Sequence, residues 1–597
     1  MKQFFKYMFA TMAGIVLLSI IGGILLVIML MGMVSGGETK IKARPNSVFV
    51  LQLNGMVNER SEDMGPMATL LGSADMAEIG LDDLTTAIRK AREDENIKGI
   101  FLEGGTTVFD SPATAQQVRD ALADFKQSGK WIIAYADQML QASYYVCSVA
   151  DSLFLNATGM IDFKGLGGKS MYMTGLYELL GVKYQTARVG RYKSYVESVT
   201  RKDMSDDDRE QRTAYLKGIW TQWTAQMAQS RGTTAARLDS LANDSIMLFA
   251  STDDYIKAGL IDRAMYPDEV QQVVRRKLGI SQDKPINQLM LSDMLHLKEK
   301  RERLKGGQVA VYYAYGEIID QAVSGFSAEH NIVGNTTVRD IQALADDNDV
   351  KAVVIRVNSG GGSAVASEQI WHAISQLSKK KPVVVSMGGV AASGGYMISC
   401  GANYIMAEPS TITGSIGIFG LIPNLSGLVT DKLGITWDGV STNKFTDYET
   451  NLIFTQDNSD EMRYMQGYTD RGYERFLDIV AKGRGMTRDQ VHEIAQGRVW
   501  LASDAVNINL VDKLGSMDDA IDKAAEMAHM DNYHICDYPA KVDWIEQLLN
   551  GDETRQSYLD GQMRQALGEF YEPLMQLRKD SQRNMLQARL PYSVAIQ

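Results

Sequence analysis

The stretch KPVVVSMGGVAASGGYMISCGANYIMAEPSTITGSIGIFGL, residues 381–421, decides the fold of this chain. It predicts a short buried strand over 383–387, a turn of small residues, a helix that begins near Ser393, and a second strand over 403–407. A serine at such a strand-to-helix turn, followed by two glycines, exposes its hydroxyl beside the free N–H of Gly394 and the positive end of the helix. These are the parts of an acyl-transfer nucleophile. The alternative is a tight helix start in which the small residues serve packing alone.

The composition is that of an ordinary globular protein with several domains, since the 597 residues are 45% hydrophobic and 22% charged. A formal net charge of −12 leaves no basic surplus to neutralise phosphates, so we expect no nucleic-acid partner. The three cysteines are widely spaced and the six histidines show no paired-ligand spacing, so the sequence predicts neither a disulfide framework nor a metal site. No Walker loop appears, and no cofactor is expected.

An uncharged apolar run extends from residue 7 to residue 37. About twenty such residues span a bilayer, so we predict a transmembrane anchor over 1–44 with residues 8–34 in the membrane. A cleaved signal peptide is the alternative, but its apolar core would be about 7–15 residues long and would end at a small-residue cleavage site. Basic residues flank the run on both sides, so the charge pattern alone does not set the orientation.

The remainder of the chain carries two copies of one α/β pattern. Each copy alternates strand-like with helix-like segments, an order typical of parallel strands joined by crossover helices. Identical residues, such as Lys98 and Lys351, recur about 250 positions apart, which indicates an internal duplication. The predicted divisions are a first α/β domain over 45–290, a second over 291–530, and a C-terminal helical tail over 531–597.

The two copies differ at the positions that bear chemistry. Ser393 aligns within one residue with Ala142 or Ser143, where the Ser-Gly-Gly order is absent. Lys193 lies in the polar loop GRYKSYVES (190–198), where the second copy reads GVSTNKFTDYE (439–449) and Lys444 falls one or two places off the position of Lys193, so we do not count it as equivalent. A serine needs a base, and a lysine can serve once burial or neighbouring cations lower its pKa. A solvated basic loop is the alternative for Lys193. His372 is the nearest histidine to the serine in sequence, and it is more typical of an ordinary helix residue.

Four motifs follow the apolar run in a fixed order: KSYVES (193–198), NSGGGSAVASE (358–368), MGGVAASGGYMIS (387–399) and TGSIGIFG (413–420). Together they resemble the signal peptide peptidase family, serine peptidase family S49, in the long tandem form of bacterial envelopes. The resemblance covers roughly residues 45–530. It implies a serine–lysine dyad with Ser393 as nucleophile and Lys193 as general base, and it implies that Ser415 hydrogen-bonds the lysine.

The resemblance also implies an oxyanion hole in which the N–H group of Gly361 or Gly362 joins that of Gly394. Two positions depart from the family pattern. Gly360 stands where the family typically has proline, which leaves the loop more flexible in the unfolded chain but keeps every N–H. Ser198 also replaces a usual proline.

At the level of the whole protein, the resemblance implies two crotonase-like or ClpP-like α/β domains behind one transmembrane helix. It implies a homo-oligomer, specifically a tetramer, in the bacterial inner membrane with its catalytic domains facing the periplasm. Its expected substrates are hydrophobic peptides, chiefly cleaved signal peptides. Two alternatives remain open: a crotonase-like acyl-CoA enzyme, and a catalytically weak or inactive oligomeric scaffold.

Overall fold

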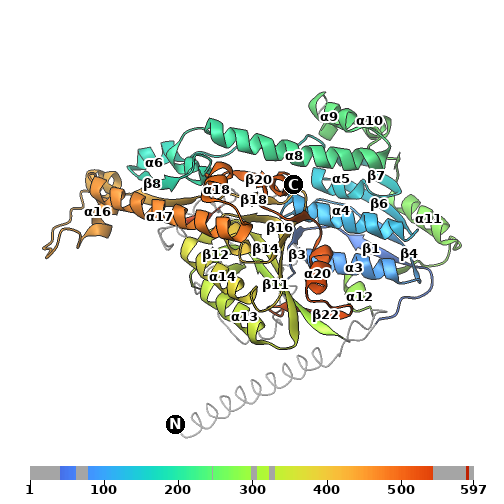
Figure 1. Cartoon of the computed structure of the whole chain (residues 1–597). Helices are drawn as coiled ribbons and strands as arrows, with labels where there is room; N and C mark the ends of the chain where they lie inside the picture. Colours follow the sequence, from blue (N-terminus) through green and yellow to red (C-terminus); the bar gives the residue numbers. More distant parts are fainter. Residues whose placement is uncertain are drawn as a thin grey trace, which may run out of the picture.

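The computed structural model describes residues 41–61, 78–244, 247–297, 306–321, 330–541 and 587–589. Two α/β units follow one another along the chain. Figure 1 shows the first, in blue to green, beside the second, in yellow to red.

The first unit is built on a parallel sheet of strand order β10-β1-β4-β6-β7-β9. Its central strands are buried on both faces, as parallel strands covered by helices are. The strands are β1 (Ser47–Gln52), β4 (Ile97–Glu103), β6 (Trp131–Met139), β7 (Ser152–Ile161), β9 (Arg263–Ala264) and β10 (Asn287–Leu289). The main helices are α3 (Leu81–Glu93), α4 (Pro112–Gln127), α5 (Gln141–Cys147), α8 (Asp206–Arg231) and α11 (Pro267–Leu278).

The second unit repeats this sheet strand for strand, in the order β22-β11-β14-β16-β17-β21. This repetition confirms the predicted duplication. The strands are β11 (Gly307–Tyr315), β14 (Val350–Ser359), β16 (Val383–Ala392), β17 (Tyr404–Ala407), β21 (Lys513–Leu514) and β22 (Tyr533–Tyr538). The helices are α13 (Gly334–Asp346), α14 (Ala364–Leu377), α15 (Gly394–Ser399), α17 (Ser459–Arg484) and α20 (Met517–Met527). Strands β18 (Ile412–Gly414) and β20 (Val499–Leu501) extend the sheet beyond the end of β16.

A third sheet joins the two units, in the order β13-β12-β15-β23-β19-β8. Strand β8 of the first unit runs antiparallel to β19 of the second, with Val189 opposite Ile418. The loop that follows β8 is thereby held against the second unit. The strands are β8 (Lys183–Val189), β12 (Glu317–Ile319), β13 (Asn331–Val333), β15 (Gly361–Ser363), β19 (Ile418–Asn424) and β23 (Gln587–Arg589).

Of the predicted C-terminal helical tail, residues 531–597, the structure describes only 531–541 and 587–589, and the stretches with helical periodicity lie outside the described residues. Its described residues form two strands, β22 and β23, and β22 completes the edge of the second sheet beyond residue 530. A strand partner at that edge satisfies the open backbone groups of β11. The rest of the tail and the predicted membrane segment 8–34 lie outside the described residues. Within the described ranges, no helix has both the length and the apolar character needed to cross a membrane.

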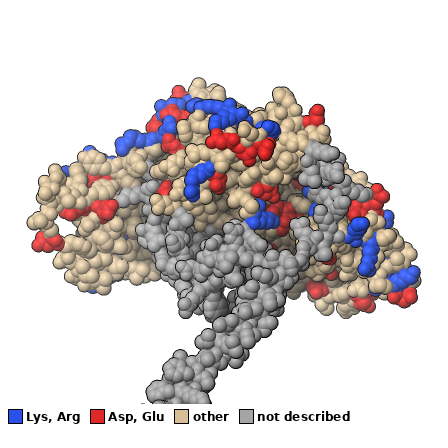
Figure 2. Space-filling model, turned by 90° about the horizontal axis from the view of Figure 1, so that it is seen from below, with Lys and Arg blue, Asp and Glu red and all other residues tan. Residues whose placement is uncertain are grey.

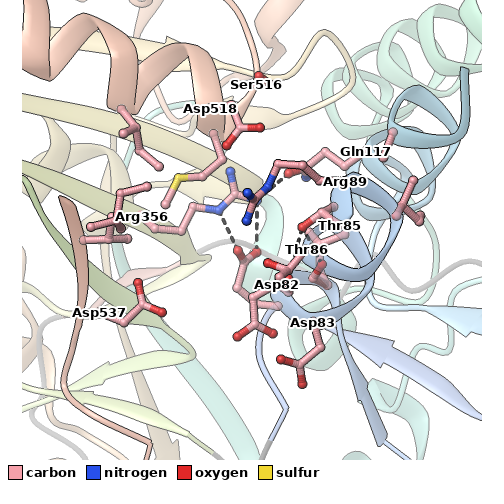
Figure 3. A pocket seen from close by; sticks show the side chains of 18 of the residues that line it. Asp82, Asp83, Thr85, Thr86, Arg89, Gln117, Arg356, Ser516, Asp518 and Asp537 are labelled. Carbon is pink, nitrogen blue, oxygen red and sulfur yellow. Dashed lines mark hydrogen bonds and ion pairs between the residues drawn. The ribbon is translucent and has the colours of Figure 1, made fainter. Parts of the chain in front are cut away.

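A cavity of about 1210 Å³ lies between the two units, lined by α3 and α4 on one side and by α20, β11 and β22 on the other. Arg356, which is 1% exposed, extends into it from β14 and hydrogen-bonds Gln117 of α4 at 2.9 Å (Figure 3). Its guanidinium also forms an ion pair with Glu59 at 2.6 Å. The units are thus joined by a buried polar network as well as by the third sheet. On the face seen in Figure 2, described acidic and basic side chains are interspersed.

Candidate active site

Ser393 lies at the turn between β16 and α15, as the sequence predicts. It has φ 57° and ψ −115°, a strained conformation for a residue with a side chain. Two backbone hydrogen bonds hold it there, from Ser393 N–H to the carbonyl of Gly414 at 2.8 Å and from Met397 N–H to the Ser393 carbonyl at 2.9 Å. The following Gly395 packs so closely on the Ser359 carbonyl that a Cβ would overlap it. The local sequence therefore fixes the direction in which the hydroxyl points.

Lys193 lies in the loop after β8, at the start of a short 3-10 helix (Ser194–Val196). The loop is fastened to the second unit, because Tyr192 N–H donates to the carbonyl of Gln496 at 3.0 Å. Gly497, with φ +77°, packs against the Lys193 backbone, where a Cβ would lie 2.7 Å from the Lys193 nitrogen. On the other side, the Gln211 amide of α8 donates to the Tyr192 carbonyl at 3.0 Å. These contacts set the position of the lysine side chain.

The structure brings together the three side chains that the family resemblance assigns to one site. Lys193 Nζ lies 2.7 Å from Ser393 Oγ and 3.0 Å from Ser415 Oγ, and it also hydrogen-bonds the Ser415 carbonyl at 3.1 Å. All three residues are 0% exposed. One unit supplies the lysine and the other supplies both serines.

The surroundings of Lys193 favour an uncharged amine. Burial lowers the pKa of Lys193 well below its ordinary value, because an ammonium in this position loses its hydration. Its hydrogen bonds to Ser393 and Ser415 go to uncharged oxygens, which compensate a positive charge less than a carboxylate does. The centre of the Phe419 ring lies 6.0 Å from Nζ, at the outer limit of a cation–π contact, so the ring compensates a positive charge only weakly. A neutral lysine here has a lone pair with which to accept the proton of a serine hydroxyl.

Two of the three predicted oxyanion glycines lie together. Gly394 begins α15, and a Cβ at Gly361 would lie 2.6 Å from the Gly394 nitrogen, so the two backbones nearly touch. The Gly361 N–H donates to Ser359 Oγ at 3.1 Å. Gly362 instead packs against the backbone of Ile318 in β12. Their catalytic roles remain predictions.

The other titratable residues considered from the sequence lie elsewhere. His372 is exposed on α14, in keeping with an ordinary helix residue. Lys444, near the corresponding place in the second copy, is exposed and pairs with Asp460 at 2.6 Å. Sequence reasoning missed the residues that position the lysine loop, above all Gly497 and Gln211. No local pattern marks them, because their role depends on contacts between distant segments.

Comparison with known proteins places the chain in a family. The model of peptidase family S49 matches the chain twice, at residues 124–281 and 375–531. The chain belongs to peptidase family S49. It is 35% identical to "Protease 4" of Haemophilus influenzae over 521 residues, covering 85% of this chain and 83% of that protein. It is 28% identical to "Serine protease SPPA, chloroplastic" of Arabidopsis thaliana, covering 82% of this chain and 70% of that protein.

Membership of family S49 makes this chain a serine protease, and its two matched segments fall on corresponding parts of the two units. Residues 312–412 also match the Clp protease family, in agreement with a ClpP-like α/β fold. Among solved structures, a mutant of ClpP1 from Listeria monocytogenes is similar over 35% of this chain and 94% of its own, with 16% identity and a TM-score of 0.23.

Proposed function

We propose that this S49 protease is an endopeptidase whose catalytic dyad is formed by Ser393 and Lys193. The 2.7 Å contact between Lys193 Nζ and Ser393 Oγ, in a site that lowers the pKa of the lysine, carries the proposal. Ser415 holds the amine in place through its side-chain and carbonyl oxygens. The geometry is that of a nucleophile within reach of its base, with the base oriented by a third group.

In the proposed reaction, Ser393 Oγ attacks the scissile carbonyl carbon while Lys193 Nζ takes the hydroxyl proton. The N–H groups of Gly394 and the Gly361 loop stabilise the negative charge on the tetrahedral intermediate. Lys193 then returns the proton to the leaving amine, which leaves an acyl-enzyme on Ser393. Water, deprotonated by the same lysine, hydrolyses this ester and restores the serine.

The dyad is tested by hydrolysis of a hydrophobic fluorogenic peptide. We expect Ser393→Ala and Lys193→Ala each to lower kcat/KM at least about a thousandfold, because each removes one member of a unit that works together. Lys444→Ala is the matched control, since it removes an exposed lysine that pairs on the surface, and it should retain full activity. Substantial activity in Lys193→Ala would identify another residue as the base.

We further propose that the substrates are hydrophobic peptides, chiefly cleaved signal peptides, and that residues 8–34 anchor the protein in a bacterial inner membrane with the catalytic units in the periplasm. The apolar run of the sequence supports the anchor. Membrane flotation of the full chain, and protease accessibility in spheroplasts, test the anchor and its orientation. Retention of a chain lacking residues 1–44 in the membrane fraction would contradict it.

We also propose a homo-oligomer, specifically a tetramer. Large apolar side chains are exposed on α6 (Thr174–Leu180) and on the segment before α16 (Tyr448–Phe454), where Leu179 is 75% and Val440 100% exposed. Figure 1 shows α6 and α16 at the same end of the molecule, the end at which β8 also lies. Apolar surface of this kind favours burial against a second copy. Sedimentation velocity should show assembled chains, and Leu179→Glu should shift them towards monomers.

A further inference from the structure

A bulge in β16 lies shortly before Ser393. The pairing of β14 with β16 shifts there, so that one residue of β14, Asn358, faces the three residues 388–390 of β16. Before the bulge β16 pairs with β17, and after it β16 pairs with β18. The Ser393 N–H then donates to the carbonyl of Gly414, the last residue of β18, at 2.8 Å. Because a bulge re-aims the residues that follow it, this one determines where Ser393 lies.

The side chain of Asn358 connects this bulge to the first unit. Its Oδ1 accepts a hydrogen bond from the Val390 N–H, inside the bulge, at 3.0 Å. Its Nδ2 donates to two carboxyl groups of the first unit, to Glu59 Oε2 at 3.0 Å and to Asp110 Oδ2 at 3.1 Å. One amide group therefore joins the backbone of β16 to two acidic side chains from the other half of the molecule.

The first unit supplies both acceptors from neighbouring strands. Glu59 follows β2 (Met56–Asn58), and Asp110 follows β5 (Val108–Phe109), which pairs with β2 in parallel. Glu59 is 4% exposed. Burial, and after it the nearby charge of Glu59, raises the pKa of Asp110 to about 6, as is typical of two carboxyl groups close together in a dry site. The amide of Asn358 therefore bridges two closely spaced carboxyl groups whose positions are set by the fold of the first unit.

The bulge has glycines where the first unit approaches it. A Cβ added at Gly388 would lie 2.7 Å from Glu59 Oε2, and a Cβ added at Gly389 would overlap the side chain of Ser111. Side chains at these two positions would push the first unit away from β16. Glycine at both positions lets the two units meet directly at the bulge.

The corresponding position of the first unit carries no such side chain. Counted from the matching residues Lys98 and Lys351, Gly105 stands where the second unit has Asn358. The first unit also has no Ser-Gly-Gly turn in the place of Ser393. The unit without the proposed nucleophile thus also lacks the side chain that holds the bulge.

We infer that Asn358 is a positioning residue for the proposed nucleophile. Its amide ties the bulge of β16 to the carboxyl groups of the first unit, and the bulge in turn holds Ser393 beside Lys193. The inference rests on the proposed function and deepens it, because the first unit then supports the serine as well as supplying the lysine. A displacement of about 1 Å at a reacting group can lower a rate about a hundredfold, so loss of this support affects the chemical step.

The first experiment uses Asn358→Asp, which keeps the size of the side chain and replaces its donor by a carboxylate that faces two others. For a hydrophobic fluorogenic peptide, we expect kcat to fall at least about tenfold and KM to stay within about threefold, because a misplaced nucleophile affects the transition state more than substrate binding. Thermal unfolding checks that the variant is folded. A kcat equal to that of the wild type would overturn the inference.

Asn403→Asp is the matched control. The Oδ1 of Asn403 also accepts a hydrogen bond from a backbone N–H of β16, that of Val383 at 2.8 Å, but at the end of the strand remote from Ser393. The control should keep the kcat of the wild type. An equal loss of kcat in both variants would show a general effect on β16 and would contradict a specific role of Asn358.

A second variant exchanges the donor and the acceptor. When Asn358→Asp is combined with Asp110→Asn, the amide at position 110 donates to the carboxylate at position 358, and the net charge of the wild type is restored. We expect the double variant to have a kcat at least about threefold above that of Asn358→Asp alone. A double variant no faster than the single one would contradict the inference. If Asn358→Asp does not fold, Asp110→Ala removes one acceptor only and should lower kcat at least about threefold at unchanged KM, and an unchanged kcat would overturn the inference.

A thiol titration without turnover separates this inference from the proposed function. In Ser393→Cys, a nearby lysine ammonium lowers the pKa of the thiol, and the ultraviolet absorbance of the thiolate reports this pKa after subtraction of the matching chain that keeps Ser393. Adding Asn358→Asp should raise the midpoint by about one pH unit or more, whereas adding Asn403→Asp should not change it.

The two failures have different signatures. If no chain hydrolyses peptides but Asn358→Asp alone shifts the thiol titration, the proposed dyad fails and the positioning role of Asn358 stands. If hydrolysis depends on Ser393 and Lys193 but Asn358→Asp changes neither kcat nor the thiol titration, the dyad stands and the positioning role fails.

Discussion

At the scale of single residues, a glycine without a side chain determines where the proposed base lies. Gly497 adopts φ +77°, and its Cα faces the backbone of Lys193. Gly485 adopts a similar φ of +62° at the end of α17, but a Cβ added there would have no other atom within 4 Å. Alanine substitutions at these two glycines therefore distinguish the effect of backbone strain from the effect of displacing the lysine.

We predict that Gly497→Ala lowers kcat/KM by at least about tenfold while Gly485→Ala leaves it nearly unchanged. Both substitutions cost about 1 kcal/mol of stability through the left-handed backbone. Only Gly497→Ala also pushes the Lys193 loop away from Ser393. Peptide hydrolysis and thermal unfolding of the two variants check this, and equal activities would show that the loop tolerates the methyl group.

The lowered pKa of Lys193 gives a second prediction at this scale. The folded chain releases the lysine proton at a lower pH than the unfolded chain does, so between the two pKa values the unfolded state binds more protons. The contribution of Lys193 to the free energy of unfolding therefore rises with pH between its folded-state and unfolded-state pKa values. In Lys193→Met this rise should disappear, as measured by urea unfolding of both proteins from neutral to alkaline pH. A parallel pH dependence in the two proteins would argue against a neutral buried lysine.

The side chains proposed to react could be predicted from the sequence more fully than the residues that hold them in position. Ser393 stands out through its glycines, while Lys193 and Ser415 were found only through family motifs, and the structure places all three in contact. Gly497 could not be predicted, because its conformation matters only where two distant loops approach each other.

At the scale of elements, strand β8 connects the two units through its pairing with β19. We predict that two separate chains, ending and starting within residues 298–305, are inert alone and recover Ser393-dependent hydrolysis when they are expressed together. Each chain lacks one member of the proposed dyad, and the third sheet and the buried contacts bring the members together. The control pair carries Lys193→Ala in the first chain. Recovery with that control would contradict a dyad shared between the units.

Local elements were largely predictable and their long-range partners were not. The predicted strand over 383–387 is the first half of β16, and the predicted strand over 403–407 is β17 with one residue less. The pairing of β8 with β19, and the insertion of β23, have no signal in hydrophobic periodicity. Periodicity reports which face of a strand is buried and does not identify its neighbour.

At the scale of the whole molecule, the polar cavity between the units contains a buried acid. Glu408 is 4% exposed, and desolvation raises its pKa to about 8, with one carboxylate oxygen lacking a hydrogen-bond partner among the described residues. The folded state holds this proton more tightly than the unfolded state, so stability is lost as pH rises from about 4.5 to about 8.

Glu408→Gln keeps the shape of the protonated acid and should remove this loss. We expect the variant to match the wild type near pH 5 and to exceed its free energy of unfolding by roughly 1–4 kcal/mol above pH 8. Glu526→Gln, on the exposed surface of α20, serves as the control and should show no such divergence. Urea unfolding at both pH values measures this difference. Equal free energies of unfolding for the variant and the wild type above pH 8 would show that a charge on Glu408 does not destabilise the folded state.

The division of the proposed dyad between the two units also implies an order in which reactivity arises during synthesis. The ribosome completes the unit that bears Lys193 before it has translated the codon for Ser393. At that stage the amine of Lys193 has no serine beside it. In the proposed mechanism, Ser393 meets its base only when the second unit has folded and β19 has paired with β8. The proposed mechanism therefore predicts that the chain becomes able to cleave peptides only late in its synthesis.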